Sequence, residues 1–402
     1  MTTIASLPRQ PVGAEAGSAS SATYDWHGVV GVRVLDWRQS DIRLVEGQLG
    51  LERAQPDRAP DLTVRFVDRL PLLGELTYLS SDAAFAGDAF VLTAGLDRRP
   101  VVRIPFAALG STCEILVVRG VSHIPLLVPT LNLAALQKGY LPVHASAFVH
   151  DGMGVLVTGG ARGGKTGTLL AFMSQGATFV GDDWVLVHPD GRAMYGLPTP
   201  MQVKAAYLDV LPEYRARLDS RTQRRMRMLS ALLRLERWVP ARSTKSSIAA
   251  RLRARVRGKL AARLTARISP QRLFGAAAQF GAGSPDVVLL TRTVESEGVR
   301  VRRLQPADLV RRLIPLLEYE WREFDQHYTL FRSAFPSRRN ELIEKKTKYL
   351  ESGLQFALKD KRTYEICYRS PAPISKVFEV LEPLISDDGS AIEGRLQGAV
   401  NE

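Results

Sequence analysis

A glycine-rich run, GGARGGKT at positions 159 to 166, fits the pattern G-x-x-x-x-G-K-[ST] and indicates phosphate binding. Glycines let backbone N–H groups converge on phosphate oxygens, and a helix that starts after the loop adds its positive end. In such loops the lysine reaches the terminal phosphates and the hydroxyl ligates Mg²⁺. A glycine-rich turn without a ligand is the alternative, but the strand-like run before the loop and the helical run after it favour binding. The expected binding residues are Gly159, Gly160, Ala161, Arg162, Gly163, Gly164, Lys165 and Thr166.

Two adjacent aspartates, Asp182 and Asp183, follow Lys165 by 17 and 18 residues, at the end of the apolar run ATFVG. One aspartate at this position is the expected Mg²⁺ ligand. The other can accept a proton from an attacking hydroxyl, because burial and a like charge would raise one of the two pKa values. We expect Thr166 and Asp183 to be metal ligands and both aspartates to be catalytic candidates. A turn with two solvated acids is the alternative, and the apolar flanks argue against it.

A histidine, His144, precedes Lys165 by 21 residues. The runs 145–149 and 153–157 read as two strands joined by Asp151-Gly152, a two-residue hairpin signal. His144 should therefore lie within one hairpin width of the phosphates. This position suggests that it stabilises charge on a transferred group or orients an acceptor hydroxyl. A packing or capping role is the alternative.

The elements that must position these residues form the order strand, loop, helix, strand, acid. The helix is expected from about 165 to 174, and WVLVH gives a further strand. Strand character returns in DVVLLT (286–291), VRVRRL (299–304) and RTYEICY, a helical stretch runs from about 306 to 358, and ISKVFEVLEPLI is a final helix. The predicted fold class is α/β or α+β.

Three regions flank or interrupt this unit. Residues 1–24 read as a disordered arm, 25–139 as a β-rich N-terminal region, and 387–402 as a flexible tail. The unit itself would then cover 140–386. The second half of IPLLVPTLNLAALQKG is expected to be helical and leads into it.

The net charge of +13 is concentrated in the segment 213–272, which holds 18 Lys and Arg against 3 Asp and Glu. One helix is expected from 213 to 238, and a second, basic and amphipathic, from about 246 to 269. Three interpretations remain open. The segment is a solvated insertion, a docking surface for an acidic peptide or protein, or a site for nucleic acid or anionic membrane.

One block of the sequence resembles a known protein family. His144, the Asp151-Gly152 hairpin, the glycine-rich loop and the Asp182-Asp183 pair look like the catalytic domain of HPr kinase/phosphorylase and its bacterial kinase-like relatives, which often start this block with His-Ala-Ser. The spacings from His144 to Lys165 and from Lys165 to Asp182 (21 and 17 residues) match that family. The resemblance covers about 140–200 and is weaker through GLPTPMQVK, DVVLLTR and the last strand and helix.

This resemblance implies a P-loop kinase core akin to phosphoenolpyruvate carboxykinase, with ATP and Mg²⁺ as ligands and a serine hydroxyl as acceptor. It also implies catalytic roles for His144, Asp182 and Asp183, and nucleotide and metal binding by Lys165 and Thr166. Some relatives phosphorylate ribosomally made precursor peptides, and others phosphorylate free serine.

The sequence departs from that family in four features. The family loop usually has a small residue where Arg162 stands, so Arg162 is expected to reach a phosphate or a neighbour. The glycine-rich signature linked to the phosphorylase reaction is not recognisable, which leaves that reaction open. Residues 25–140 do not resemble the N-terminal domain of true HPr kinases, and the arginine-rich insertion is foreign to them. HPr itself is therefore not the expected substrate.

Other polar residues give weaker signals. Lys204 and Arg292 lie near the expected active face and either bind a phosphate or are solvated. We expect structural roles for His123, His150 and His188, which lack metal-ligand spacing, and a packing role for Trp184.

The bulk composition restricts the class of protein. The N-terminus lacks the apolar stretch of a secretory signal, no run approaches a spanning helix, and the two cysteines suit a reducing cytoplasm. The predicted function is an ATP-dependent serine kinase acting on a peptide or small protein. The alternatives are a nucleotide-binding regulatory module that contacts nucleic acid or membrane, and a kinase for free serine. A homo-oligomer is compatible with all three.

Overall fold

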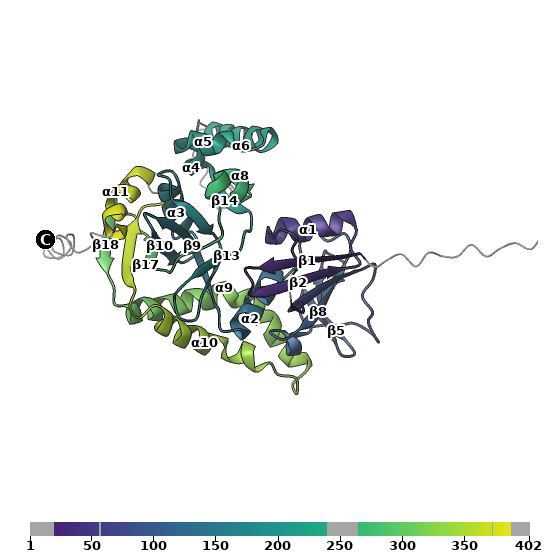
Figure 1. Ribbon diagram of the computed structural model, residues 1–402. Coiled ribbons are helices and arrows are strands. Elements are labelled where there is room, and N and C mark those ends of the chain that lie inside the picture. Colours follow the sequence, from purple (N-terminus) through teal and green to yellow (C-terminus); the bar gives the residue numbers. More distant parts are fainter. Residues whose placement is uncertain (1–19, 56–57, 239–263, 372, 387–402) are drawn as a thin grey trace, which may run out of the picture.

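The computed structural model describes residues 20–55, 58–238, 264–371 and 373–386, and its strands form two large sheets (Figure 1). An eight-stranded sheet is built from the N-terminal part of the chain, and a nine-stranded sheet follows it. Helices pack against both. The protein is thus a mixed α/β protein, as the order of strand-like and helical runs predicts.

The N-terminal sheet buries one core of alternating side chains, as the pattern of β3 shows. Its strands in spatial order are β1 (Ser21–Trp26), β2 (Val30–Leu35), β3 (Leu62–Val67), β8 (Cys113–Val118), β7 (Arg99–Arg103), β6 (Ala89–Ala94), β5 (Ala83–Ala86) and β4 (Thr77–Tyr78). Helices α1 (Gln39–Leu49), η1 (Phe106–Ala108) and α2 (Leu127–Gln137) accompany them. These strands lie mostly within the region that the sequence reads as β-rich, and α2 falls where the second half of its segment predicts a helix.

Two details of this region differ from expectation. Strand β1 starts at Ser21, inside the predicted arm of residues 1–24, because Ser21–Trp26 pairs residue for residue with β2. Helix α1 was not expected, although Ile42, Val45 and Leu49 give it a buried face at helical spacing. The rest of the arm, and the predicted tail 387–402, lie outside the described residues.

The second sheet carries the glycine-rich loop. Its strands in spatial order are β16 (Gly281–Ala282), β13 (Met194–Gly196), β12 (Trp184–Val187), β9 (Leu141–His150), β10 (Met153–Gly159), β17 (Val287–Thr293), β19 (Arg362–Tyr368) and β18 (Val299–Arg303), and β11 (Thr178–Gly181) also pairs with β9. Strands β10, β17 and β19 are parallel. Helices α3 (Lys165–Met173) and α11 (Ile374–Ile385) share one core with this sheet, and α9 (Pro306–Ala334) and α10 (Glu341–Ala357) share the other.

Helix α9 contributes to two hydrophobic cores. Its first half places Leu309 and Leu313 under the second sheet, whereas Trp321, Phe324 and Phe331 join the core of the N-terminal sheet. The helical stretch expected over 306–358 is thus two helices. Asn340 separates them because its side chain caps α10 through the N–H of Ile343.

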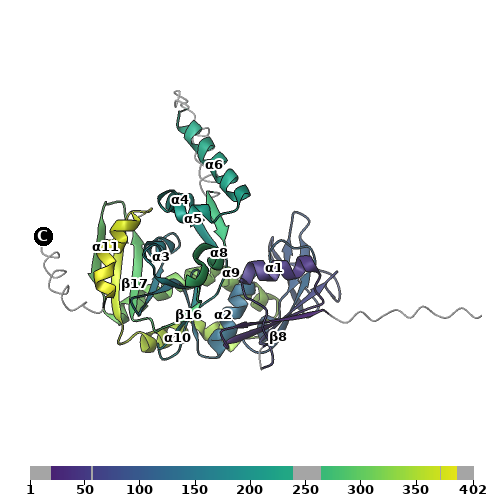
Figure 2. The ribbon, with the colours of Figure 1, turned by 45° about the horizontal axis from the view of Figure 1, so that its top comes forward.

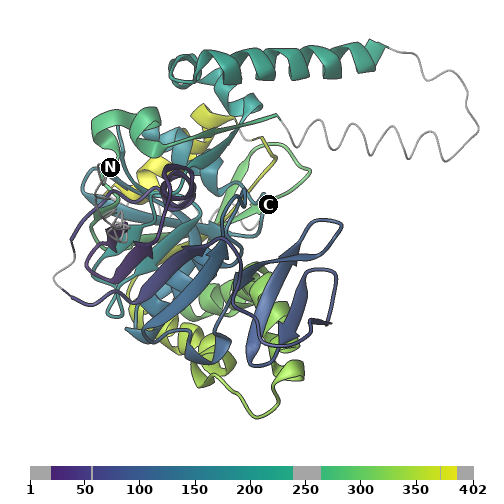
Figure 3. The same ribbon diagram turned by 90° about the vertical axis from the view of Figure 1, so that its right-hand side faces the viewer.

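The basic segment lies only in part within the described residues. Helices α4 (Ala205–Val210), α5 (Pro212–Ala216) and α6 (Ser220–Trp238) are described, and α6 projects away from both sheets (Figure 2, Figure 3). The second expected helix is wrong at its end, because Thr265–Ile268 forms strand β15, which pairs with β14 (Met201–Lys204). Residues 239–263 lie outside the described residues. Helices α8 (Pro270–Phe274) and η2 (Gly275–Ala277) follow.

Candidate active site

The glycine-rich loop joins β10 to α3 in the order that the motif predicts. Gly159 has φ of 146° and Gly164 has φ of 109°, values that favour glycine. A Cβ atom on Gly164 would collide with the hydroxyl of Tyr368, and that hydroxyl donates to the carbonyl oxygen of Gly164 at 2.7 Å. Tyr368 also shares a hydrogen bond of 2.9 Å with the Thr168 hydroxyl, so β19 fixes both the loop and the first turn of α3.

Lys165 is buried at the start of α3 and its ammonium group folds back onto the loop. The Nζ atom donates to the carbonyl oxygens of Gly159 at 2.9 Å and Gly160 at 3.2 Å. Burial lowers the pKa of Lys165, while the carboxylates of Asp182, Glu320 and Asp183 act in the opposite sense. A buried ammonium group is stabilised by nearby negative charge, and phosphate groups would supply such charge to a lysine of a phosphate-binding loop.

Asp182 lies in the break between β11 and β12 and is buried. The Ser146 hydroxyl donates to its Oδ1 atom at 2.5 Å, and the Thr166 hydroxyl lies 3.3 Å from each of its carboxylate oxygens. Burial is the main cause that raises the pKa of Asp182, and the charge of Asp183 adds to it. The carboxylate that contacts Thr166 is therefore that of Asp182, whereas the sequence suggested Asp183.

Asp183 differs sharply from its neighbour, because its side chain is 58% exposed and its φ is 81°. Its Oδ1 atom lies 3.2 Å from Nε2 of His144. The break in the strand thus turns two consecutive carboxylates to different partners. One is buried beside the hydroxyls of Ser146 and Thr166, and the other faces the imidazole.

His144 is on β9, directly opposite Trp184 in β12, and its imidazole lies between two carboxylates. The second is Glu320 of α9, whose Oε1 atom is 3.1 Å from Nδ1. Both atoms are buried without an aligned hydrogen bond, so this contact is electrostatic. Burial alone would lower the pKa of His144, but Asp183 and Glu320 outweigh burial and raise it.

One cavity of about 860 Å³ brings these groups together. Of the residues expected from the sequence, it is lined by His144, Ala161, Arg162, Gly163, Gly164, Lys165, Thr166, Asp182 and Asp183. Gly159 and Gly160 stand behind it and hold Lys165 through their carbonyl oxygens. Strand β14, the start of α4 and Thr265 of β15 form the opposite wall.

Comparisons with known proteins do not assign the chain to a family. No family model matches the sequence, and no curated protein matches it. Among the described residues, no helix is both long and apolar enough to cross a membrane.

Three residues of the site were not expected from the sequence. Ser146 had a usable signal, because it lies two residues after His144 and alternate strand residues share a face. Tyr368 and Glu320 had none, since they reach the loop and His144 from β19 and α9, far along the chain.

The weaker candidates divide as follows. Lys204 is half-buried in the cavity wall, whereas Arg292 is largely exposed and pairs with Glu365 at 3.1 Å. The His150 ring packs on Phe172, and Trp184 packs on His144. Within the described ranges, no group of three or more His, Cys, Asp or Glu is placed to hold a metal ion.

Proposed function

We propose that the protein is an ATP- and Mg²⁺-dependent kinase with a P-loop core of the HPr kinase type, which transfers the γ-phosphoryl group to a serine-type hydroxyl of a peptide or small protein. The observation that carries this proposal is the shared cavity of Lys165, the Asp182-Asp183 pair and His144. A phosphate-binding loop alone would suit any nucleotide-binding protein. An acceptor hydroxyl must also lose its proton, which the second carboxylate can accept. The imidazole can stabilise charge on the transferred group.

The residues present fit a magnesium ion. Thr166 and Asp182 offer hard oxygen atoms within 3.3 Å of each other, and Mg²⁺ in kinases is held by one or two carboxylates together with substrate phosphates. The absence of a larger ligand cluster among the described residues agrees with this mode. When bound, the ion would neutralise charge on the phosphate oxygens.

On the acceptor side, Asp183 is the group that would accept the proton. Its carboxylate is exposed to the cavity and is oriented by His144. The hydroxyl oxygen of the acceptor forms a bond to the γ-phosphorus, the bond from that phosphorus to the bridging oxygen of ADP breaks, and the hydroxyl proton passes to Asp183. Asp183 and Glu320 raise the pKa of His144 and so favour its charged form, which would stabilise negative charge on the transferred group.

The experiment incubates the protein with radiolabelled ATP, Mg²⁺, and pools of serine-containing peptides or free serine. We expect Asp183→Asn to lower transfer by about 10²–10⁴-fold at saturating Mg²⁺. Asp182→Asn should instead raise the Mg²⁺ concentration needed for half-maximal transfer. Asp190→Asn, an exposed aspartate paired with His188, is the matched control.

Two outcomes would count against the proposal. If wild type and Asp183→Asn transfer equally little to every acceptor, the kinase claim is wrong. If the protein binds ATP without transfer and binds DNA in a steeply salt-dependent way that needs the exposed arginines of α6, the regulatory module is the better interpretation. Those arginines include Arg221, Arg224 and Arg227.

A further inference from the structure

Arg162 occupies a position in the glycine-rich loop that its backbone makes unfavourable. Its φ of 63° lies in the left-handed region, where a side chain is strained and glycine is not. The conformation is held in place, because the Thr293 hydroxyl donates to the Arg162 carbonyl oxygen at 3.1 Å. Such strain at a ligand-binding loop points to a use for the side chain.

Lys204 brings a second cation to the same cavity from a different element. It ends β14, and it lines the cavity together with Arg162. Burial lowers the pKa of Lys204, and the charge of Arg162 lowers it further, so the two groups are close enough to repel. Among the described residues, neither cation forms an ion pair that would offset this repulsion. An anion between them would remove it.

Lys204 and Lys165 line the cavity from different elements. Lys165 stands at the start of α3 and is held by the carbonyl oxygens of Gly159 and Gly160, whereas Lys204 ends β14. The loop amides and Lys165 suffice for the terminal phosphates of a nucleotide. The anion expected at Arg162 and Lys204 is therefore a different group.

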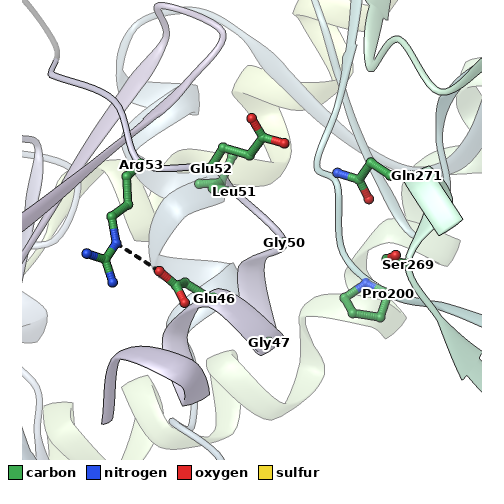
Figure 4. A pocket seen from close by; sticks show the side chains of 9 residues that line it. All are labelled: Glu46, Gly47, Gly50, Leu51, Glu52, Arg53, Pro200, Ser269 and Gln271. Atoms are coloured by element: carbon green, nitrogen blue, oxygen red, sulfur yellow. Dashed lines mark hydrogen bonds and ion pairs between the residues drawn. The ribbon is translucent and has the colours of Figure 1, made fainter. Parts of the chain in front are cut away.

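An open groove of about 680 Å³, whose lining residues are drawn in Figure 4, adjoins the cavity. It lies between the end of α1 and the loop before α8, and it meets the cavity at Pro200, which lines both and immediately precedes β14. Glu46, paired with Arg53 at 3.0 Å, and the exposed Glu52 line the groove. Carboxylates there disfavour a polyphosphate, so the groove suits the acceptor rather than the nucleotide.

We infer that Arg162 and Lys204 form a carboxylate-binding subsite that recognises an acidic side chain next to the target serine of a peptide acceptor. The guanidinium fork and the ammonium group together suit a carboxylate. The peptide would extend from this subsite past β14 into the groove. This inference rests on the proposed function, because it names the chemistry of the acceptor in that same site.

The test measures binding rather than transfer. Two fluorescent peptides, alike except for Asp or Asn beside a central serine, are titrated by anisotropy against protein with MgADP at physiological salt. Wild type should bind the Asp peptide about tenfold more tightly. The double variant Arg162→Gln, Lys204→Met should lose this preference, and Arg162→Lys, Lys204→Arg should keep most of it.

The matched control removes two exposed cations elsewhere, Arg224→Gln with Lys376→Met, and should keep the preference. It also tests whether α6 merely attracts acidic peptides. MgADP affinity should stay within about threefold of wild type in this control. The inference would be overturned if wild type showed no preference, or if the preference survived in Arg162→Gln, Lys204→Met. It would also be overturned if that variant lost as much affinity for MgADP as for the Asp peptide. The last result would assign the pair to a nucleotide phosphate.

The two proposals can fail separately. If the Asp preference depends on Arg162 and Lys204 but no acceptor is phosphorylated, the subsite stands and the kinase claim falls. If serine peptides are phosphorylated with no dependence on the neighbouring carboxylate, the kinase stands and the subsite falls.

Discussion

The two cavity-lining residues with unusual backbones, Arg162 and Asp183, both carry positive φ angles, of 63° and 81°. The left-handed conformation costs a residue with a Cβ atom about 1–2 kcal/mol relative to its preferred state. In each case the conformation turns a charged side chain to the cavity. Stability is thus lost at the positions where the chemistry would occur.

This strain can be measured at Arg162 by comparing two truncations. At ordinary positions glycine is less stable than alanine by about 0.5–1 kcal/mol. At Arg162 the order should reverse, so Arg162→Gly should be more stable than Arg162→Ala by about 1 kcal/mol in urea unfolding. The neighbouring substitution Ala161→Gly should be destabilising, because Ala161 lacks a positive φ. A Gly variant less stable than the Ala variant would show that the backbone is not strained.

At the scale of residues, the sequence predicts well the groupings that depend on neighbouring segments of the chain. The motif spacing brings Lys165, Thr166, Asp182 and His144 into one cavity, because hairpin and strand-loop-helix geometry fix their separation. Which aspartate meets Thr166 could not be predicted, since it depends on how the break after β11 turns each side chain. Glu320 could not be predicted either, because its contact with His144 depends on where α9 packs.

At the scale of elements, the packing of α9 into two hydrophobic cores determines where its charged side chains lie. Leu317 and Trp321 fix the register of the helix, and Glu320 between them meets His144. Contact with His144 lowers the pKa of Glu320, and the same contact helps to raise the pKa of His144. Glu320 is thus a positioning residue, which acts on the cavity through the imidazole.

Substituting Glu320 by Gln should therefore shift the titration of His144. Burial lowers the pKa of His144 and the Glu320 carboxylate raises it, so the pKa should fall when that carboxylate is removed. The check is the NMR titration of the His144 ring, whose midpoint should move to lower pH in Glu320→Gln. Glu318→Gln, two residues earlier on the same helix, is the control. An unchanged midpoint would mean that the contact is only steric.

Two elements near the C-terminus were predicted closely. The runs of β19 and α11 are confirmed almost residue for residue. The error at β15 has a physical cause. Charge and a four-residue apolar spacing suggested a helix to about 269, but Thr265–Ile268 gains more by pairing with β14 than by continuing a helix.

At the scale of the whole molecule, His27 lies where the two sheets meet. Its ring lies 5.4 Å from that of Tyr195, and the Trp26 indole beside it donates to the Gly196 carbonyl oxygen at 3.1 Å. Burial lowers the pKa of His27 from its ordinary 6.5. Hydrogen bonds to the backbone carbonyl oxygens of Gly196 and Phe280 raise it, but burial has the larger effect. The folded protein therefore binds this proton less readily than the unfolded chain.

The sign of the resulting pH dependence follows. A histidine whose folded pKa is depressed favours folding above its unfolded pKa, and this contribution is lost as pH falls below 6.5. His27→Asn, which tolerates the positive φ of 49°, should lose less stability than wild type between pH 7.5 and 5.5. Equal slopes for wild type and His27→Asn in urea unfolding would contradict the prediction.

The sharing of α9 between two cores also sets an order for folding during synthesis. The N-terminal sheet is complete at Val118, but its core needs Phe324 and Phe331, about 200 residues later. At ribosomal rates of about 5–20 residues per second, the sheet would wait roughly 10–40 s with one face uncovered. We expect the nascent chain to expose part of its N-terminal apolar core until α9 has been made, so a ribosome stalled between β18 and α9 would display the N-terminal sheet in an unfinished state.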